Sequence, residues 1–482
     1  MSDGARRILA NAAYRLIADV GSKLASVVFF VVMARELGNE QFGVFAFGLA
    51  FVTLASTLAN FGQDQILTRE VARDHGLLDR YFANTMAIKL VIAGISLAVT
   101  IGIATAAGLD SVTRDVTILL GLAVVLELLM STCFASYQAF ERLEYIPVAL
   151  ISQRFLTAVV GIAALLGGAG VVAVAGIYLA GAVVGFALAV WLLLERVARP
   201  RLAVDTHRWW PLMRAALPIG LAGVFAVVLF RIDTVMLAAY ESKDVVGDYS
   251  AAYRLFEATL FVSWSIGAAV YPVFSRLSPS SEPSVGFVYE RSLKLVTALT
   301  LPLAAGAAVL PGPVVDTLYG EQYDEAAPAL RLLAPAIALY PLSYLGGYLL
   351  VSQNRQRVLT LVYGVVALEN VLLNLVLIPT LSLEGAALGT SISQLLVAVA
   401  FVAVSQQTVG RIAWRRVLAG PVAATVLATV AMVLLRGNFW AGLSAATLVY
   451  VAALVAIELT LYSEDARAVL DLVPLRRRTS TA

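Results

Sequence analysis

Long apolar runs recur along this chain of 482 residues and constrain its fold more than any other feature. Each run is about 20 residues long, the length that an α-helix needs to cross the hydrocarbon core of a bilayer. Transmembrane β-strands would be shorter and would alternate apolar with polar residues, whereas these runs are continuous. With 60% hydrophobic and 14% charged residues, the composition lies outside the soluble range. We therefore expect an all-α polytopic membrane protein.

The runs predict about fourteen transmembrane helices, with a basic linker between the sixth and the seventh. The expected spans are 11–35, 42–62, 83–107, 115–138, 148–167, 171–195, 215–239, 248–273, 290–311, 327–351, 358–379, 385–406, 416–435 and 439–461.

The distribution of basic residues predicts the orientation of the chain. An even number of spans puts both termini on one side, and about 23 of the 34 lysines and arginines fall on that side, against about five on the other. Because basic loops stay in the cytoplasm, we expect both termini there. The linker, which contains Trp209 and Trp210, is then expected at the cytoplasmic surface.

Short segments of the first half recur in the second half. Residues 40–46 (EQFGVFA) resemble residues 244–250 (DVVGDYS), and residues 176–180 (GIYLA) resemble residues 385–389 (GAALG). An offset of about 200 residues in both pairs indicates an internal duplication of six spans with a shared orientation. We therefore expect an N-lobe at 1–198, a linker at 199–214, a C-lobe at 215–410, two further spans at 411–462 and a basic cytoplasmic tail at 463–482.

Charged residues inside the predicted spans are candidates for function, because each costs about 2.5 to 3.5 kcal/mol near the bilayer centre. Arg15, Asp19 and Lys23 follow each other at spacings of four and share one face of the first span. They form either a cationic wall of a water-filled cavity or a structural set, in which Arg15 reaches the interface and the other two pair. The other cations in spans are Lys89, Arg154, Arg231 and Arg254; the other acids are Glu127, Asp233, Glu257 and Glu369.

The chain lacks the residues that several other kinds of site require. The single cysteine, Cys133, excludes a disulfide within the chain, and the two histidines offer no metal-binding cluster. No sequence of the form GxxxxGK[S/T] is present, so we expect neither ATP-driven transport within this chain nor an organic cofactor.

Three segments carry a resemblance to a known family. They are Arg35-Glu36-Leu37-Gly38 with Gln41-Phe42-Gly43, then residues 246–252 (VGDYSAA), then residues 318–323 (LYGEQY) leading to 329–331 (ALR). In these segments the chain resembles the polysaccharide-export branch of the multidrug/oligosaccharidyl-lipid/polysaccharide exporter superfamily, which includes Wzx-like O-antigen flippases. The resemblance covers nearly the whole chain.

The resemblance implies two six-helix lobes around a central cavity, with two extra C-terminal helices. It implies alternating access, in which the lobes rock to carry a polyprenyl-linked oligosaccharide across the cytoplasmic membrane for cell-surface polysaccharide synthesis. The implied partners are this substrate, membrane lipid, and polymerases or glycosyltransferases of the same pathway; nucleic acid is not among them. The substrate's pyrophosphate is anionic, so the candidate substrate-binding cations are Arg15, Lys23, Lys89, Arg154, Arg231 and Arg254.

The resemblance also implies an ion site. Asp233, Asn370, Asn374 and Thr390 resemble the sodium site of lipid II flippases in this superfamily, and oxygen ligands from facing helices suit a hard cation. The asparagines alternatively join helices by hydrogen bonds. Proton coupling remains a second option, through Asp19, Glu127, Asp233, Glu257 or Glu369.

Two other functions remain open from the sequence. An ion-coupled multidrug antiporter of the same superfamily would favour acidic lobes and apolar pockets, whereas the first span here is net basic. A membrane glycosyltransferase or polymerase would need a sizeable loop or domain outside the membrane, whereas the longest outer loop, 311–328, is short. We therefore expect a transporter rather than an enzyme.

Overall fold

The computed structural model describes residues 3–201, 203–277 and 284–461, and in these ranges every side chain except those of 3–20, 22–24, 218–219 and 461. All regular elements in the described ranges are helical, because a backbone in lipid must satisfy its own hydrogen bonds. The long helices are α1 (Asp3–Ser56), α3 (Leu78–Ala106), α4 (Ser111–Ala139), α5 (Tyr145–Leu166), α6 (Val171–Leu192), α7 (Trp209–Tyr240), α8 (Lys243–Arg276), α9 (Val285–Val309), α11 (Ala326–Ser352), α12 (Gln356–Val409), α13 (Trp414–Leu434) and α14 (Phe439–Leu461). Shorter ones are η1 (Thr57–Asn60), α2 (Gln63–Arg73), η2 (His75–Leu77), η3 (Leu193–Val197), η4 (Thr206–Arg208), α10 (Pro311–Leu318) and η5 (Glu321–Tyr323).

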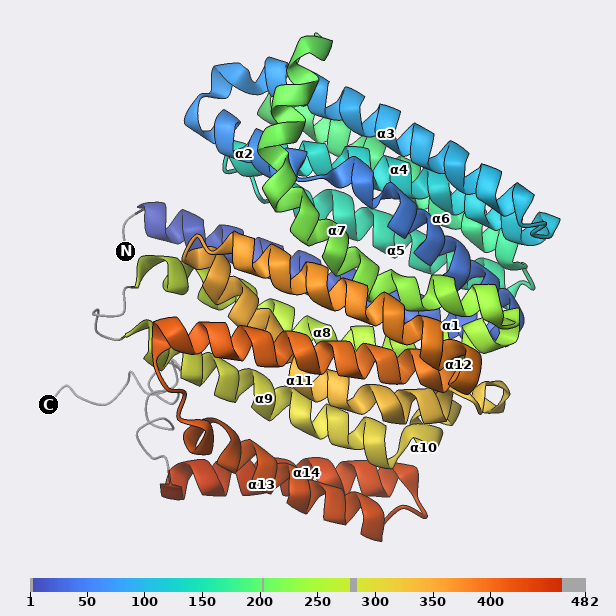
Figure 1. The fold of residues 1–482 in the computed structure, drawn as a ribbon, viewed down its shortest axis with the longest axis vertical. Helices are drawn as coiled ribbons and strands as arrows, with labels where there is room; N and C mark the ends of the chain where they lie inside the picture. The colour runs from blue at the N-terminus through green and yellow to red at the C-terminus, as the bar shows by residue number, and fades with distance from the viewer. Residues whose placement is uncertain (1–2, 202, 278–283, 462–482) are drawn as a thin grey trace, which may run out of the picture.

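The described ranges contain twelve helical segments that are long and apolar enough to cross a membrane. Two helices, α1 and α12, have 54 residues each, so a straight course would extend about 81 Å, well beyond a bilayer. Both are broken by one residue with positive φ, Gly38 at 75° and Ser382 at 54°. The chain reverses at each break, as Figure 1 shows, so twelve segments give the fourteen crossings that the apolar runs predicted.

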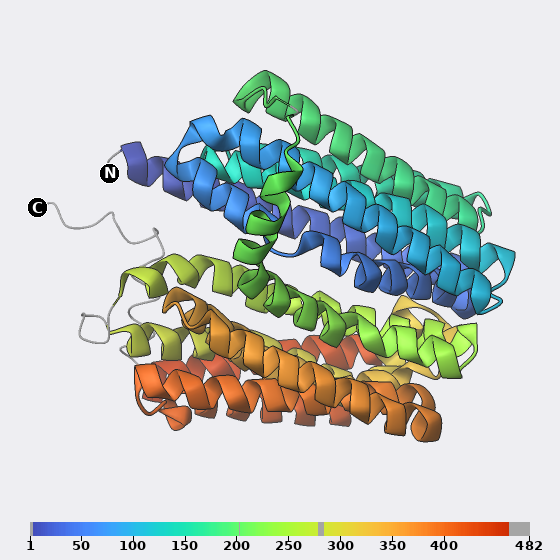
Figure 2. The same cartoon turned by 45° about the horizontal axis from the view of Figure 1, so that its top comes forward.

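The helices form two lobes and a C-terminal hairpin (Figures 1 and 2). In the N-lobe, α4 packs against α6, and α1 packs against α4 and α5; in the C-lobe, α11 packs against α8, α9 and α12, and α12 packs against α7. α13 and α14 pack against each other, and α13 lies against α9. The two-lobed all-α architecture expected from the resemblance is therefore confirmed.

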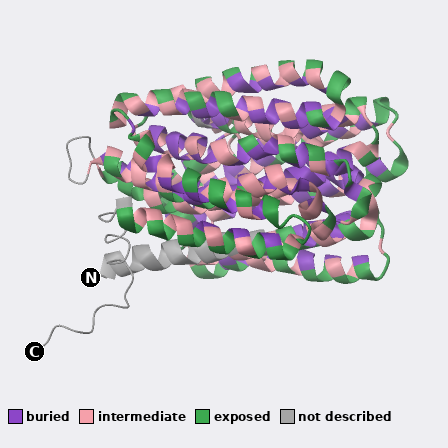
Figure 3. Cartoon of the chain, turned by 90° about the horizontal axis from the view of Figure 1, so that it is seen from below, coloured by how far each residue is buried: buried purple, intermediate pink, exposed green. Residues whose placement is uncertain are grey.

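Burial follows the pattern of a membrane protein. Figure 3 shows the buried residues between the helices and the exposed ones along the outside of the bundle. Large apolar side chains such as Phe155, Leu361 and Leu448 are more than 60% exposed, which suits a surface that faces lipid.

The segment between the lobes differs in one detail from the expected linker 199–214. α7 begins at Trp209, so residues 209–214 are its first turns. Leu212 and Ala216 are buried against Ile66 and Ile88 of the N-lobe, and this packing stabilises the helix from its start. α7 thus contacts the N-lobe at its beginning and α12 of the C-lobe farther along.

Candidate functional site

A charged cluster lies well inside the helices, and its C-lobe part centres on Glu257. One carboxylate oxygen lies 3.0 Å from Arg231 Nη1, and the other lies 2.8 Å from Arg254 Nη1. Arg254 also lies over the ring of Phe30 from the N-lobe, 3.9 Å from its centroid. α7 and α8 meet at a short connection, which places Arg231 and Arg254 about 14 and 17 Å from the nearest helix end.

The N-lobe contributes a second set at the same depth, centred on Glu127. Arg154 Nη2 lies 3.2 Å from Glu127 Oε1, which also accepts a hydrogen bond of 2.6 Å from Gln153. Arg154 donates a second bond of 2.8 Å to the hydroxyl of Tyr178. These residues come from α4, α5 and α6, so one polar set joins three helices of the lobe.

Aromatic rings connect the two charged sets. Phe30, under Arg254, packs edge-on against Phe45, which packs edge-on against Tyr178 of the N-lobe set. The hydroxyl of Tyr178 is also close enough to Arg231 and Arg254 to interact electrostatically with both. We call the five charged residues of the two sets the central cluster: Glu127, Arg154, Arg231, Arg254 and Glu257.

The central cluster has the charge and the exposure of a binding site for an anion. Three arginines face two glutamates, so the net charge is +1, and the side chains keep 18% to 26% of their surface exposed. Guanidinium groups bind phosphate through paired hydrogen bonds, and the low dielectric of the membrane interior strengthens that attraction.

At the end of the helices opposite the N-terminus, the two lobes touch through the repeated segments of the sequence (Figure 1). Gly43 lies against the backbone of Lys243, where an added Cβ would be 1.9 Å from the carbonyl oxygen. Gly247, at the matching position of the second repeat, lies against Asn39, where a Cβ would be 2.0 Å from the carbonyl oxygen. The duplicated glycines therefore allow α1 and α8 to approach each other closely.

The outer loop adds contacts across the same boundary. Arg35 donates a hydrogen bond of 2.7 Å to the Thr317 carbonyl, Tyr323 donates one of 2.9 Å to Ala34, and Gln322 donates one of 3.1 Å to Arg35. These bonds hold α10 and η5 over the break in α1, so the two lobes are closed on this side of the cluster.

An ion pair at the same end joins α8 to α4. Lys243 Nζ lies 2.6 Å from Oδ2 of Asp110, the residue that caps the start of α4. Burial raises the pKa of Asp110, but hydrogen bonds from Lys243 and Thr113 outweigh burial and hold that pKa well below its usual range.

Lys89 lies apart from the central cluster, in contrast to its expected role in the substrate cavity. Its side chain is fully buried and pairs with Asp64 at 2.6 Å. It also donates hydrogen bonds of 3.0 Å to the Leu128 carbonyl and 2.8 Å to Ser131. Because the ammonium group has these partners inside the N-lobe, its contacts are structural and connect α2, α3 and α4.

The four residues of the expected ion site do come together. Asp233 Oδ1 accepts a hydrogen bond of 2.5 Å from Asn374, and its Oδ2 accepts bonds of 2.5 Å from Thr390 and 3.1 Å from Tyr249. Asn374 also donates to Asn370 at 3.2 Å. Glu369 joins from the side, because Ser393 accepts from Asn370 and donates to Glu369.

This group has features that fit a bound cation. Oδ1 of Asn374 is buried without a hydrogen-bond partner, and it faces Gly389, where a Cβ would come within 2.6 Å of it. A carboxylate, two amide oxygens and a hydroxyl form the oxygen-rich donor set that hard cations prefer. The part of the chain that the structure describes contains no group of three or more His, Cys, Asp or Glu side chains that could hold a metal ion.

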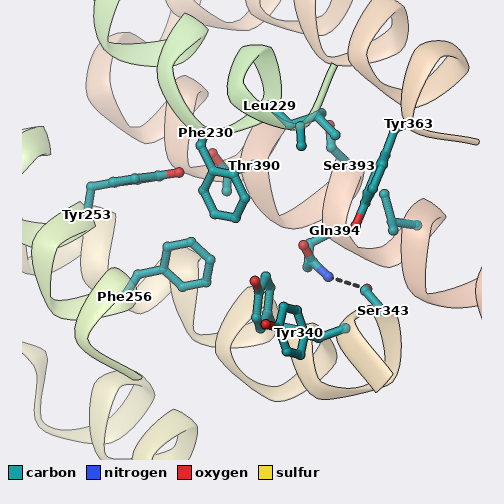
Figure 4. A pocket seen from close by; sticks show the side chains of 13 residues that line it. Leu229, Phe230, Tyr253, Phe256, Tyr340, Ser343, Tyr363, Thr390, Ser393 and Gln394 are labelled. Atoms are coloured by element: carbon teal, nitrogen blue, oxygen red, sulfur yellow. Dashed lines mark hydrogen bonds between the residues drawn. The ribbon is translucent and has the colours of Figure 1, made fainter. Parts of the chain in front are cut away.

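A small cavity of about 40 Å³ lies next to this group, inside the C-lobe. Figure 4 shows its walls, in which Phe230, Tyr253, Phe256 and Tyr340 surround a space that Thr390 also reaches. The cavity therefore lies between the Asp233 group and the part of α8 that carries Arg254 and Glu257.

Other predicted residues fall outside the described side chains. Arg15, Asp19 and Lys23 belong to α1, but their side chains are not described, so their expected roles stay predictions.

Sequence reasoning missed several partners of the predicted residues. Tyr178 was noted only as part of a repeat, and Asp64 lies just past the predicted second span, where a loop was expected. A buried lysine in a span requires a counter-ion nearby, and this requirement could have identified Asp64 as a candidate from the sequence.

Comparisons with known proteins agree with this geometry. The model of the family described as "Polysaccharide biosynthesis protein" matches residues 8–278, and the MatE model matches residues 218–376. A probable low-salt glycan biosynthesis flippase of Haloferax volcanii is 23% identical over 382 residues, 78% of each chain. A putative O-antigen transporter of Shigella dysenteriae is 23% identical over 71% of this chain and 87% of its own length.

Two further likenesses are a shorter sequence match and a solved structure with the same fold. An uncharacterized membrane protein of Methanocaldococcus jannaschii is 25% identical over 174 residues, and that match spans 34% of its length. The solved structure of the lipid II flippase MurJ in an inward closed conformation superposes with a TM-score of 0.76 at 12% identity, covering 92% of this chain and 98% of that one. Since its family model matches more than half of the residues, the chain belongs to the polysaccharide biosynthesis protein family, as the resemblance predicted.

Proposed function

We propose that this protein is a flippase that carries a polyprenyl-(pyro)phosphate-linked oligosaccharide across the cytoplasmic membrane by alternating access. The observation that carries the proposal is the central cluster, in which arginines of both lobes lie within membrane-spanning helices and are linked by the aromatic rings between the lobes. The names of the Haloferax and Shigella relatives, a glycan flippase and an O-antigen transporter, support the same class of substrate.

In this proposal the glutamates hold the arginines until substrate arrives. Glu127 and Glu257 neutralise two of the three positive charges, which lowers the cost of burying them. The pyrophosphate of the substrate replaces the glutamates as the acceptor of arginine hydrogen bonds. Because arginines of both lobes take part, bound substrate favours a state in which the lobes are close.

Alternating access requires the contacts at the outer side to break and re-form. In this proposal the described conformation, with the glycine contacts and the Lys243–Asp110 pair intact, precedes release. We propose the cytoplasm as the location of both termini, which makes this closed side the outer one. The proposed partners are glycosyltransferases of the same pathway, which act before transport, and polymerases, which act after it.

The Asp233 group is the proposed coupling site. Asp233, Asn370, Asn374 and Thr390 would hold a sodium ion, which would supply positive charge in place of the hydrogen bonds that Asp233 now accepts. A proton on Asp233 is the alternative. Either event changes the contacts between α7 and α12, the two helices that the group joins.

The test is transport by purified protein in liposomes that contain a polyprenyl-diphosphate oligosaccharide. Access of an added glycosidase to the sugar reports translocation, with a sodium gradient, a proton gradient or neither. We expect translocation that one of the gradients accelerates and that Asp233→Asn uncouples from it. Folded protein that leaves the lipid in place but exchanges cationic dyes for ions would contradict the proposal in favour of a drug antiporter.

A further inference from the structure

A second basic site lies at the end of the N-lobe where α7 begins, away from the central cluster. It is a pocket of about 200 Å³ between α2, α3 and the residues before α7. Each of these segments contributes one arginine to its wall: Arg69, Arg80 and Arg208. One acidic residue, Glu70, also lines the wall, so the four charged side chains carry a net charge of +2. The rest of the wall is partly apolar, with Ile66 and Leu212 among its residues.

The arginines of this pocket have unused hydrogen-bonding capacity. Arg208 donates through Nε to Asp205 at 2.7 Å, but its Nη1 is buried and has no partner. Arg80 forms no ion pair among the described residues, whereas Arg69 pairs with Glu70 at 2.7 Å. A buried guanidinium N–H without an acceptor is unfavourable, so an anionic acceptor in the pocket would complete the site.

The framework around these arginines is held in place. The Asn84 side chain accepts bonds from the Asp205 backbone at 2.9 Å and from Trp209 Nε1 at 3.2 Å, and it donates one of 2.7 Å to the Arg80 carbonyl. A single amide thus ties α3 to the segment before α7. The backbone segments that carry Arg80 and Arg208 are therefore held together before any ligand binds.

The pocket lies at the depth of lipid headgroups. Trp209 and Trp210 follow Arg208 directly, and Trp210 is 75% exposed, as is usual for tryptophans at a membrane interface. Ile66 and Leu212 form the wall next to the apolar core that α7 shares with α2 and α3. The arginines of the pocket suit the phosphate of a phospholipid, and the apolar side chains beside them suit its acyl chains. A soluble anion would use only the arginines.

We propose that this pocket binds the phosphate of an anionic membrane phospholipid, with Arg80 and Arg208 as its main ligands. The phosphate bridges the N-lobe to the start of α7, the helix that continues into the C-lobe. Gly220 on α7 lies close to Phe61, where a Cβ would be 2.4 Å from the carbonyl oxygen, so α7 already touches the N-lobe here. Bound lipid would strengthen this contact.

The test measures binding of single lipids to the detergent-purified full chain by native mass spectrometry. Phosphatidylglycerol is titrated against wild type, Arg80→Gln, and Arg80→Gln with Arg208→Gln; phosphatidylcholine serves as the neutral lipid. Each arginine near a lipid surface contributes about fivefold in affinity, so the single variant should bind phosphatidylglycerol about fivefold more weakly and the double variant about 25-fold. The control is Arg411→Gln, an exposed arginine at the same end of the C-lobe.

Three outcomes decide the proposal. Weakened phosphatidylglycerol binding in the pocket variants, with the control unchanged, supports it. Equal binding by all variants overturns it, and tight binding of inorganic pyrophosphate without preference for phosphatidylglycerol overturns the lipid as the source of the phosphate. If the double variant does not fold, the fivefold change in Arg80→Gln decides, because that side chain is exposed. None of these measurements depends on transport activity.

Discussion

Replacing Gly247 by alanine should open the outer side of the protein. The new Cβ would lie 2.0 Å from the Asn39 carbonyl oxygen, whereas ordinary contacts begin at 3.4 Å, so α1 and α8 must separate by about 1.4 Å. The three nearest atoms to the Cβ all belong to the backbone of Asn39, so no side chain can rotate away. Overpacking of this kind costs about 1 to 3 kcal/mol, which lowers the ratio of closed to open protein by about 5- to 150-fold.

Cysteine labelling measures this shift. Cys133 is the only cysteine and is buried, so Val44→Cys in a Cys133→Ala background provides a single probe. Val44 is 3% exposed in the closed arrangement and lines a pocket of about 680 Å³ between the lobes. A membrane-impermeant maleimide added outside should therefore reach it slowly, and faster when the lobes part. We expect labelling at least fivefold faster after Gly247→Ala.

The matched control is Gly306→Ala on α9, where an added Cβ meets nothing within 4 Å. It should leave the labelling rate unchanged. If folded Gly247→Ala protein is labelled no faster than the control, then the glycine contact does not hold the outer side closed and our reasoning is refuted.

Three further predictions concern the other charged groups. Lys89→Met should lower the free energy of unfolding by about 3 kcal/mol, because it leaves the largely buried Asp64 carboxylate without its counter-ion. Combining it with Asp64→Leu should restore most of the loss, and an unchanged melting temperature for the single variant would contradict this. Asp110 has a depressed pKa, so its ion pair stabilises the folded closed form above the unfolded pKa of about 3.9 and is lost only as pH falls towards the folded value. The labelling rate at Val44→Cys, divided by that of a small free thiol at the same pH to correct for the thiolate fraction, should therefore be the same at pH 8 and pH 5. A rise of this ratio at pH 5 would argue against the pair. Glu257→Gln should tighten binding of the lipid-linked substrate and slow its release, since it removes the competitor for two arginines; weaker binding in an equilibrium titration would count against that role.

The sequence predicted the elements that depend on local chemistry. Unbroken apolar runs predict membrane helices because lipid leaves the backbone no other partner, and all fourteen crossings follow from them. The segment α2 was missed because its polar residues, such as Asp64 and Arg69, break the apolar pattern that identifies a span. Its burial depends on contacts with α3, α4 and α7, which are distant in sequence.

The candidate site was predictable in composition but not in arrangement. Arg154, Arg231 and Arg254 were identified because charge in a membrane span is expensive, and Lys89 satisfied the same criterion. Only the tertiary structure separates them, since Lys89 pairs with Asp64 inside one lobe, whereas Arg254 of the C-lobe lies over Phe30 of the N-lobe. The repeated glycines were visible as a duplication, but their role as a contact requires the positions of α1 and α8.

The central claim is that arginines of both lobes bind the substrate together. The most direct measurement is the initial rate of translocation of polyprenyl-diphosphate oligosaccharide in liposomes, for wild type, Arg154→Gln from the N-lobe and Arg231→Gln from the C-lobe. Because hydrogen bonds to charged groups contribute about 1.5 to 3 kcal/mol, each variant should be slower by about 10- to 150-fold, while Arg436→Gln, an exposed arginine outside the cluster, should keep the wild-type rate. Wild-type rates for both cluster variants would contradict the account.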